Sequence, residues 1–264
     1  MSDYLVTGAN GYVGSKIIEY LENKQIEYVG IDKHGDKSTK VHQFNLNNKN
    51  KLFAILRQTD PKIIIHCGTY SAIPYRDNFL ESFKEDSLSL SNILDFLKIY
   101  PHIRLIFFSS SYVYSGISSQ EICTEELPLS PTHNFGIAKL FFEKLIIRCH
   151  PNSIVFRLSS VFGSGNQLQP NAIKNMIKQG LNNKVLDIWG EGKRKMQYIY
   201  INDVIESIIT SKLFSPGIYN LGGSDYISVS DTAKIIANKT FSKMNFIKDK
   251  KEGYTLPFMS IAKL

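Results

Sequence analysis

Three glycines near the N-terminus have the spacing of a loop that binds a pyrophosphate. Gly8, Gly11 and Gly14 follow the apolar segment Tyr4–Thr7 and overlap a helical pattern that begins at Tyr12. Glycines at this spacing allow a tight turn, close approach of the backbone to a pyrophosphate, and close packing of helix on strand. The start of the helix offers free N–H groups and a positive dipole end to the phosphates. We therefore expect a dinucleotide site here.

Asp32 has the position of a residue that binds the adenosine ribose of such a dinucleotide. It ends the second apolar segment, 24 residues after Gly8, and an acid near this distance accepts hydrogen bonds from ribose hydroxyls. Its carboxylate would repel a 2′-phosphate, which favours NAD over NADP, although Lys33 beside it weakens that preference. The other expected cofactor contacts are Asn10, Tyr12, Val13, Asn45, Leu46, Cys67, Gly68 and Thr69.

Apolar strand patterns alternate with amphipathic helix patterns through the first two thirds of the chain. The expected strands are Tyr4–Thr7, Glu27–Ile31, Val41–Phe44, Lys62–His66, Arg104–Ser109 and Ser153–Arg157. The expected helices are Tyr12–Glu22, Lys49–Arg57, Ser87–Ile99, Phe135–Cys149 and Asn202–Ser211. Short strands that are apolar on both faces are typical of a parallel sheet covered by helices on each side. The fold class is therefore α/β, with a doubly wound parallel sheet of the Rossmann type.

The pattern changes after Phe162–Gly165. A helix near Ala172–Gln179, a strand near Val185–Trp189 and a helix after Ser228 indicate a smaller lobe interleaved with the main one. We expect an NAD-binding domain formed by residues 1–165 and about 194–215. A small C-terminal substrate lobe would comprise about 166–193 and 216–264.

Composition limits the classes of function. The chain has 264 residues and is 43% hydrophobic, enough for one substantial core. We expect a cytoplasmic protein without a membrane segment, because no apolar run approaches ~20 residues and no signal peptide is evident. Its three cysteines support neither a disulfide framework nor a metal site. The net charge of +7 lacks a basic block, which argues against a nucleic-acid partner.

Several segments in order resemble the extended short-chain dehydrogenase/reductase family, in its NAD-dependent epimerase/dehydratase branch that modifies nucleotide sugars. The resemblance covers nearly the whole chain. It rests on Thr7–Gly14, Ile65–Thr69, Ser109–Tyr114, Asn134–Lys139, Arg157–Gly163, Gly190–Gly192, Ile201–Val204 and Tyr219–Gly222. The resemblance implies NAD as cofactor and a nucleotide sugar as substrate. It also implies a homodimer built from the helix after the fourth strand and the helix of Phe135–Cys149, in which Phe141, Phe142, Leu145 and Ile146 serve either core or interface.

The resemblance also implies the reacting groups. Ser110 matches the family's catalytic serine, and Lys139 matches the lysine that binds the nicotinamide ribose and lowers the pKa of a tyrosine four residues earlier. Such a cation is needed because a free phenol, with a pKa near 10, is a poor base at neutral pH. This chain has Phe135 at the tyrosine position. A phenyl ring carries no proton, so the acid/base contribution, typically ~10²–10⁴-fold, is lost there.

Three explanations of Phe135 stay open. Another group supplies the proton, for which His133, Tyr112 and Ser111 are the local candidates; the phenylalanine was introduced to trap a complex; or the chain is a binding protein without catalysis. His133 is the only nearby side chain whose ordinary pKa lies close to neutrality. Tyr112 stands where the family's dehydratases carry a glutamate. Lacking that acid, the chain resembles the dehydrogenases, reductases and epimerases more than the dehydratases.

The substrate contacts depart further from the family pattern. Ser160 replaces the family's substrate-contacting asparagine, and Met196 stands at the position of the arginine that clamps the diphosphate. Arg194 could replace that charge, because arginine contacts phosphate in a bidentate manner. Trp189 follows an apolar strand and is expected in the core. The leading interpretation is hydride transfer at a sugar carbon, commonly C4, and the alternative is a catalytically silent protein that binds NAD or a sugar nucleotide.

Overall fold

The centre of the molecule is a seven-stranded parallel sheet. The computed structural model describes residues 2–35, 40–165 and 171–264. The strand order is β11-β7-β5-β4-β1-β2-β3, and each neighbouring pair runs in parallel. The strands are β1 (Tyr4–Thr7), β2 (Tyr28–Asp32), β3 (Val41–Gln43), β4 (Ile63–His66), β5 (Arg104–Ser110), β7 (Ser153–Leu158) and β11 (Gly217–Leu221). The doubly wound α/β prediction is confirmed.

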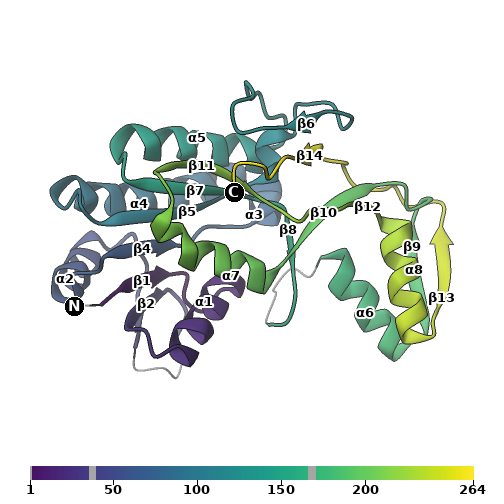
Figure 1. The fold of residues 1–264 in the computed structure, drawn as a ribbon, viewed down its shortest axis with the longest axis horizontal. Coiled ribbons are helices and arrows are strands. Elements are labelled where there is room, and N and C mark those ends of the chain that lie inside the picture. The colour runs from purple at the N-terminus through teal and green to yellow at the C-terminus, as the bar shows by residue number, and fades with distance from the viewer. Residues whose placement is uncertain (1, 36–39, 166–170) are drawn as a thin grey trace.

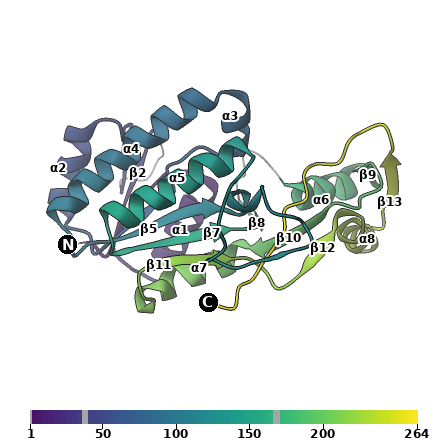
Figure 2. The same ribbon diagram turned by 90° about the horizontal axis from the view of Figure 1, so that it is seen from above.

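Helices cover both faces of this sheet (Figures 1 and 2). On one face, α1 (Tyr12–Asn23) and α7 (Ile201–Thr210) pack against a cluster that includes Val6, Ile106 and Phe156. On the other face lie α2 (Lys49–Thr59), α4 (Phe79–Ile99) and α5 (Asn134–Cys149), over a second cluster. The short α3 (Ala72–Asp77) precedes α4. Burial of apolar area on both faces is what holds the sheet together.

Helix α4 begins eight residues earlier than the predicted start at Ser87. Its first two turns contain Glu81, Lys84 and Glu85, which interrupt the apolar periodicity. The inward side of these turns is nevertheless filled by Phe83, packed against the core, and by the buried Asp86. An acidic residue among core-facing positions interrupts the apolar periodicity in the sequence, although the helix itself continues through it.

The smaller lobe lies beside the carboxyl ends of the sheet strands (Figures 1 and 2). It contains α6 (Ala172–Asn182), α8 (Val229–Thr240) and the parallel pair β9 (Val185–Trp189) and β13 (Lys243–Ile247). A three-stranded sheet of β8 (Ser160–Phe162), β10 (Lys195–Tyr200) and β12 (Tyr226–Ser228) joins it to the main domain. The remaining elements are β6 (Ile122–Cys123), β14 (Phe258–Met259) and the 3₁₀ turns η1 (Ser111–Tyr114) and η2 (Ser211–Leu213).

Two strands belong to a different part of the molecule from the one that the expected domain boundaries assign to them. β11 pairs with β7 at the edge of the large sheet, although the sequence pattern predicts residues after 216 in the small lobe. β10, expected in the main domain, pairs with β8 and β12 instead. The expected boundary at 165/166 touches residues 166–170, which lie outside the described residues.

The prediction that Trp189 belongs to the core is wrong. Its side chain is 53% exposed, because Val185, Asp187 and Trp189 form the outward face of β9 while Leu186 and Ile188 point inward. The Lys250 ammonium lies 4.8 Å from the centre of the indole ring. Strand alternation, rather than hydrophobicity, decides the position of this tryptophan.

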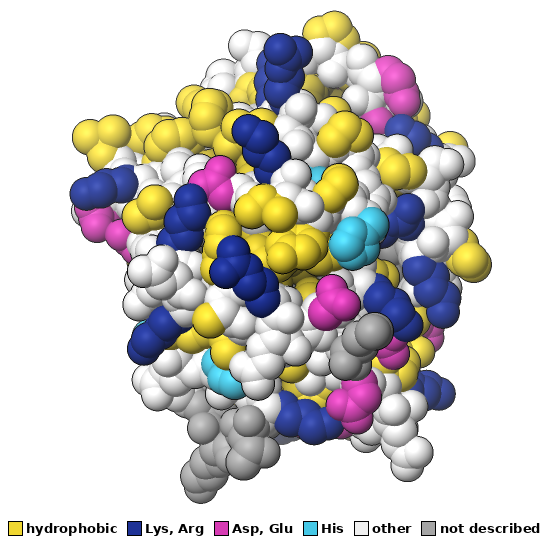
Figure 3. Space-filling view, turned by 90° about the vertical axis from the view of Figure 1, so that its left-hand side faces the viewer, with side chains coloured by type: hydrophobic (Ala, Val, Ile, Leu, Met, Phe, Trp, Pro, Cys, Tyr) yellow, Lys and Arg dark blue, Asp and Glu magenta, His cyan; other side chains and the backbone are white. Residues whose placement is uncertain are grey.

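Charge is dispersed on the surface at the end of the sheet away from the small lobe. Figure 3 shows Lys and Arg side chains scattered there among acidic and apolar ones, without a continuous basic patch on this face. Within the described ranges, no helix combines the length and apolar character required to cross a membrane. The same residues contain no group of three or more His, Cys, Asp or Glu side chains placed to hold a metal ion.

Candidate active site

The loop between β1 and α1 approaches the neighbouring backbone so closely that only glycine fits. Gly8 has a φ of +64°, and a Cβ there would lie 2.7 Å from the backbone of Cys67 and Gly68. At Gly14 a Cβ would lie 2.1 Å from the Gly8 carbonyl oxygen. Gly11 donates its N–H to that same oxygen at 2.9 Å. The turn therefore has the shape expected of a pyrophosphate-binding loop, with the start of α1 directly behind it.

Asp32 lies at the end of β2 with its carboxylate already oriented. It accepts hydrogen bonds from the Asn10 N–H at 3.0 Å and the His34 N–H at 2.8 Å. The side chain of Asn10 donates to the His34 carbonyl, which ties the glycine loop to the end of β2. Lys33 is exposed and its ammonium contacts Tyr70 rather than Asp32. Each carboxylate oxygen of Asp32 thus accepts one backbone N–H and keeps a further lone pair for a ligand.

The other expected cofactor residues lie along the same edge of the sheet. Cys67, Gly68 and Thr69 follow β4, and the Gly68 N–H donates to the Thr7 hydroxyl at 3.3 Å. Asn45 and Leu46 follow β3; Leu46 is buried and its carbonyl accepts from Asn92, whereas Asn45 is exposed. Tyr12 and Val13 begin α1. The carboxyl ends of parallel strands are where α/β sheets bind ligands.

Lys139 is buried on α5 and held by two hydrogen bonds. Its Nζ donates to Thr69 Oγ1 and to the Phe108 carbonyl, each at 2.9 Å. An ammonium has three N–H groups, so one more remains for a ligand such as a ribose hydroxyl. Burial lowers the pKa of Lys139 to about 8, and the charges of Asp86 and Glu143 act against that decrease. Lys139 is mostly cationic at pH 7 and lies at the cofactor edge.

Sequence reasoning missed two residues that support Lys139. Asp86 on α4 is 3% exposed and accepts hydrogen bonds from the Tyr70 N–H and from the Tyr75 hydroxyl, the latter at 2.8 Å. Burial raises the pKa of Asp86, while the Lys139 charge and these bonds lower it. Burial likewise raises the pKa of Tyr75. The one available sequence signal was an aspartate within the apolar stripe of α4.

His66 lies at the end of β4 next to Lys139 and is fully buried. Its Nδ1 is 2.7 Å from Thr7 Oγ1, and its ring lies against Phe107. Burial lowers the pKa of His66 to about 3, and the positive charge of Lys139 acts in the same direction. The imidazole is therefore neutral across the physiological range.

This neutral histidine predicts an acid-sensitive fold. Between pH 6.5 and 3 the unfolded chain takes up a proton that the folded chain excludes, so we expect the free energy of unfolding to fall as pH is lowered. The contribution of one proton is at most about 1.4 kcal/mol per pH unit. Urea unfolding at several pH values gives the slope of the free energy of unfolding against pH. This slope should be shallower for His66→Gln than for the wild type. Equal slopes would contradict this role for His66.

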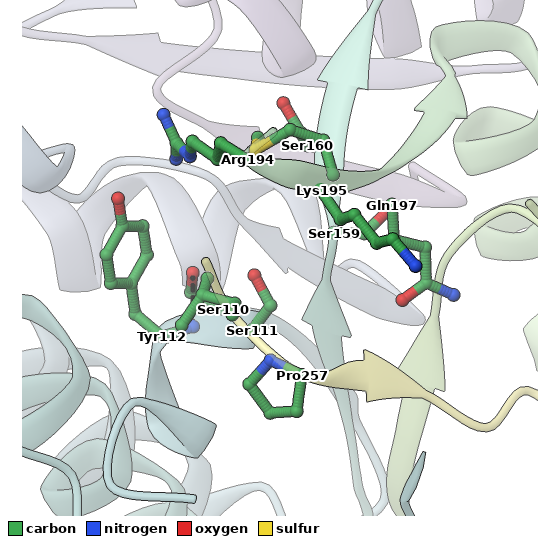
Figure 4. A pocket seen from close by; sticks show the side chains of 11 residues that line it. Ser110, Ser111, Tyr112, Ser159, Ser160, Arg194, Lys195, Gln197 and Pro257 are labelled. Atoms are coloured by element: carbon green, nitrogen blue, oxygen red, sulfur yellow. Dashed lines mark hydrogen bonds between the residues drawn. The ribbon is translucent and has the colours of Figure 1, made fainter. Parts of the chain in front are cut away.

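Beyond the cofactor edge, a cavity of about 150 Å³ lies between the large sheet and the small lobe. Ser110, at the end of β5, and Ser111 and Tyr112, in η1, line one side of it. Ser160 on β8 and Arg194 before β10 line the other side (Figure 4). In Figure 4 the Tyr112 hydroxyl points toward the side of the pocket that carries Arg194. The fold thus brings together the expected serine, the tyrosine and the expected substrate contacts.

Phe135 lies beside this cavity within an aromatic cluster. Its ring centre is 5.5 Å from that of Tyr75 and 5.9 Å from that of Tyr112. The Lys139 ammonium is 5.4 Å from the centre of the Phe135 ring. The Phe135 ring therefore lies near both the Lys139 ammonium and the Tyr112 ring, and Tyr112 rather than Phe135 is among the described residues that line the cavity.

His133 caps the helix that carries Phe135 and Lys139. Its Nδ1 accepts a hydrogen bond from the Phe135 N–H at 3.1 Å, so in the neutral ring the proton is on Nε2. Its ring lies 4.4 Å from that of Tyr112, centre to centre. Burial lowers the pKa of His133, and the charge of Arg76 adds to this effect. These contacts fit a capping and positioning role better than that of a proton source.

Removing this cap should cost stability. We expect His133→Ala to lower the free energy of unfolding by about 0.5–2 kcal/mol, because α5 loses the acceptor for one of its first N–H groups. His133→Asn should retain most of the stability, because asparagine is a good N-cap. Thermal and urea unfolding of the two variants measures the difference. Equal losses in both would exclude capping as the cause.

Comparison with known proteins places these features in a family. Residues 4–222 match the model of the NAD dependent epimerase/dehydratase family. The chain is 27% identical over 260 residues to a protein of Bacillus subtilis described as an uncharacterized UDP-glucose epimerase, YtcB, covering 88% of this chain and 80% of that protein. It is also 27% identical to the dTDP-D-glucose 4,6-dehydratase of Dictyostelium discoideum, covering 89% of this chain and 61% of that enzyme.

Solved structures show the same fold. The Thermus thermophilus UDP-glucose 4-epimerase in complex with NAD superposes with a TM-score of 0.85 at 18% identity, covering 98% of this chain and 91% of that one. MoeE5 in complex with UDP-glucuronic acid and NAD gives a TM-score of 0.86 at 20% identity, covering 99% and 91%. The family match spans most of the chain. The chain belongs to the NAD-dependent epimerase/dehydratase family.

Proposed function

We propose that the chain is an NAD-dependent nucleotide-sugar oxidoreductase or epimerase that acts at a sugar carbon, C4 by analogy with its relatives, and that Tyr112 carries the proton in place of Phe135. The observation that carries this proposal is the cavity in which Ser110 and Tyr112 face Arg194 and Ser160. A hydroxyl donor, a phenol and a guanidinium cation thus line one cavity at the cofactor edge of the sheet.

The cofactor contacts fit NAD. The Gly8–Gly14 loop would hold the pyrophosphate, Asp32 the adenosine ribose and Lys139 the nicotinamide ribose, and NADP is disfavoured by the Asp32 carboxylate. When bound, NAD accepts a hydride from a sugar carbon or returns one to it. The chain's own residues must position the sugar, hydrogen-bond its reacting oxygen and move the proton of that oxygen.

Those proton steps can be assigned to two side chains. In the oxidative direction the proton of the sugar hydroxyl passes to Tyr112 in its phenolate form and leaves the neutral phenol. In the reductive direction that phenol gives its proton to the carbonyl oxygen and becomes the phenolate again. Ser110 hydrogen-bonds the same sugar oxygen; its Oγ accepts the Tyr112 N–H at 3.3 Å, so its own proton can be donated. Arg194 supplies positive charge for the diphosphate.

A second candidate is a protein that binds NAD and sugar nucleotides without turnover. It is favoured by Phe135, which lacks the phenol oxygen at the family's usual position. An enzyme in which the tyrosine had been replaced by phenylalanine to trap the substrate complex would also carry Phe135 at this position.

One experiment separates these functions. The wild type and Phe135→Tyr are incubated with NAD or NADH and a panel of UDP-, GDP- and dTDP-sugars, with products identified by mass and NMR. Turnover by the wild type with little gain from Phe135→Tyr supports Tyr112 as the proton carrier. A gain of about a hundredfold or more favours a scaffold that lacks only the tyrosine. Binding without product in both favours the silent protein.

The helices α4 and α5 also support a homodimer as part of this proposal. Of the four residues with an undecided role, Phe142 and Ile146 are buried, whereas Phe141 is 48% exposed and lies one turn after the exposed Ile137 on α5. Leu88 on α4 is exposed as well. We expect light scattering to give a dimeric mass for the wild type and a monomeric mass for Phe141→Glu. A monomeric wild type would refute the homodimer.

A further inference from the structure

The loop Gly190–Arg194 forms a cradle of backbone N–H groups around an anion, and in this structure the anion is a side chain of the same protein. Glu252 Oε1 accepts from the N–H groups of Glu191 at 3.0 Å and Lys193 at 3.1 Å, and Oε2 accepts from the N–H of Arg194 at 2.5 Å. Gly190 and Gly192 have φ values of +62° and +68°. Successive N–H groups turned inward by such a backbone are a known design for binding phosphate.

The positive charge of the side chains at the cradle is larger than the single negative charge of Glu252. Lys193, Arg194 and Lys195 follow one another along the loop. Lys193 pairs with Glu191, Lys195 lies 5.5 Å from the centre of the Tyr226 ring, and the Arg194 Nε donates to the Tyr254 carbonyl at 2.8 Å. Three cations therefore lie in succession at this loop, where Glu191 pairs with Lys193 and Glu252 accepts from the backbone N–H groups. A dianionic group suits this site better than the single charge of Glu252.

Glu252 also begins a segment that closes the substrate cavity. We call residues Glu252–Pro257 the strap. Besides its two contacts with Arg194, the strap is held by the Tyr254 hydroxyl, which donates to the Ser115 carbonyl at 2.6 Å, and by the Leu256 carbonyl, which accepts from the Tyr226 hydroxyl at 2.5 Å. Leu256 and Pro257 line the same cavity as Ser111, and Figure 4 shows Pro257 on the side of the pocket that carries Ser111. The strap contains no helix or strand, so a few hydrogen bonds hold most of it in place.

The cavity has room for a sugar-sized group, and a second space lies next to it. The first has a volume of about 150 Å³ and the second about 650 Å³, and Lys195 borders both. The strap also borders both, because Leu256 and Pro257 line the first space and Thr255 the second. A ligand that spans the two spaces would contact the strap, which is also the segment that occupies Arg194.

We propose that the Gly190–Arg194 cradle is a binding site for a phosphate or diphosphate group, and that Glu252 occupies it until such a group displaces the carboxylate and releases the strap. This inference rests on the proposed function only for the source of the phosphate, a nucleotide sugar. On release, Arg194 loses the Tyr254 carbonyl and gains phosphate oxygens, and the cavity opens at Leu256 and Pro257. The substrate thus opens its own site by replacing one anion with another.

Limited proteolysis tests this displacement directly. Lys250 and Lys251 are exposed trypsin sites immediately before the strap. With NAD at saturation, so that the cofactor loop is filled, inorganic pyrophosphate should accelerate cleavage there. Glu252→Gln should be cleaved rapidly without pyrophosphate and should bind it more tightly, by on the order of tenfold, because a charged competitor for the N–H groups has been removed. The matched control is Glu206→Gln, which removes an exposed carboxylate on α7, outside both the cradle and the strap, and should behave as the wild type.

Hydrogen exchange distinguishes release of the strap from collapse of the loop. With pyrophosphate bound, the amides of Lys193 and Arg194 should stay protected while those of Gly253–Thr255 lose protection. Protection of the strap by pyrophosphate, or affinity that is unchanged in Glu252→Gln, would overturn the proposal.

The nucleotide-sugar panel separates this inference from the proposed function. If pyrophosphate opens the strap but no nucleotide sugar binds, the anion site stands and the proposed substrate does not. If a nucleotide sugar binds and reacts while the strap stays protected, the proposed substrate stands and the displacement does not.

Discussion

Replacing Tyr112 with phenylalanine is expected to lower kcat by about 10²–10⁴-fold, the usual contribution of a general acid/base, on the nucleotide sugar that the enzyme accepts. KM should change little, because the phenylalanine ring would keep the contacts that Tyr112 makes with His133 and Phe135. Steady-state kinetics of the two proteins, with folding checked by circular dichroism, gives the ratio. The phenol oxygen is the only heavy atom removed, so a loss confined to kcat assigns the proton to it.

The position of Phe135 supplies a matched rescue. In Tyr112→Phe/Phe135→Tyr the phenol moves next to Lys139, whose ammonium lies 5.4 Å from the centre of the ring at position 135. We expect this double variant to recover activity, because a cation beside a phenol stabilises the phenolate. Ser111→Ala is the control, since Ser111 lines the same cavity and its loss should have a much smaller effect. If Tyr112→Phe kept wild-type turnover, another residue would carry the proton and this assignment would fail.

The parts of the site that depend on local spacing could be predicted from sequence. The glycine loop and Asp32 were expected from their spacing along β1, α1 and β2, whereas Lys139 was expected from the family resemblance. The parallel strands were likewise evident, because they are short and apolar on both faces. Their ends shifted by only a residue or two.

Features that depend on contacts between distant segments could not be predicted in this way. Glu252 contacts the Gly190–Arg194 loop although the two are about sixty residues apart in the sequence. No periodicity in either segment indicates that they pair. The Asp86 carboxylate near Lys139 was hidden for a related reason: in a sequence pattern an acid marks a solvent-facing position, whereas here Tyr75 and Tyr70 satisfy it inside the core. Satisfied burial of polar groups is a property of the tertiary structure.

The ion pair that anchors helix α5 to the sheet is another contact that the sequence pattern does not predict. Arg157 on β7 contacts Glu143 on α5 with an Nη2–Oε2 distance of 2.8 Å, and their side chains are 3% and 1% exposed. The Arg157 Nη1 also donates to the Tyr114 hydroxyl at 2.8 Å, and the Ser109 hydroxyl donates to Glu143. Burial disfavours the Arg157 cation, but the bonds and charge of Glu143 together raise its pKa. Both side chains are deeply buried.

We expect Arg157→Met to lower the free energy of unfolding by about 3–5 kcal/mol, because it leaves the Glu143 carboxylate buried without its partner. Urea unfolding monitored by circular dichroism measures this change. Arg157→Met/Glu143→Leu should regain part of the loss, since neither charge then remains in the core. Lys62→Met, which breaks the exposed pair of Lys62 with Asp3, is the control and should have little effect.

The ion pair should matter for the site as well as for stability. Glu143 lies one turn beyond Lys139 on α5, so the contact with Arg157 on β7 fixes the register of the helix that presents the lysine to the cofactor. Arg157→Met is therefore expected to weaken NAD binding, measured by calorimetry at a temperature where the variant remains folded. A variant with the full stability loss but wild-type NAD affinity would show that α5 is positioned by its apolar face alone, through residues such as Phe142 and Ile146.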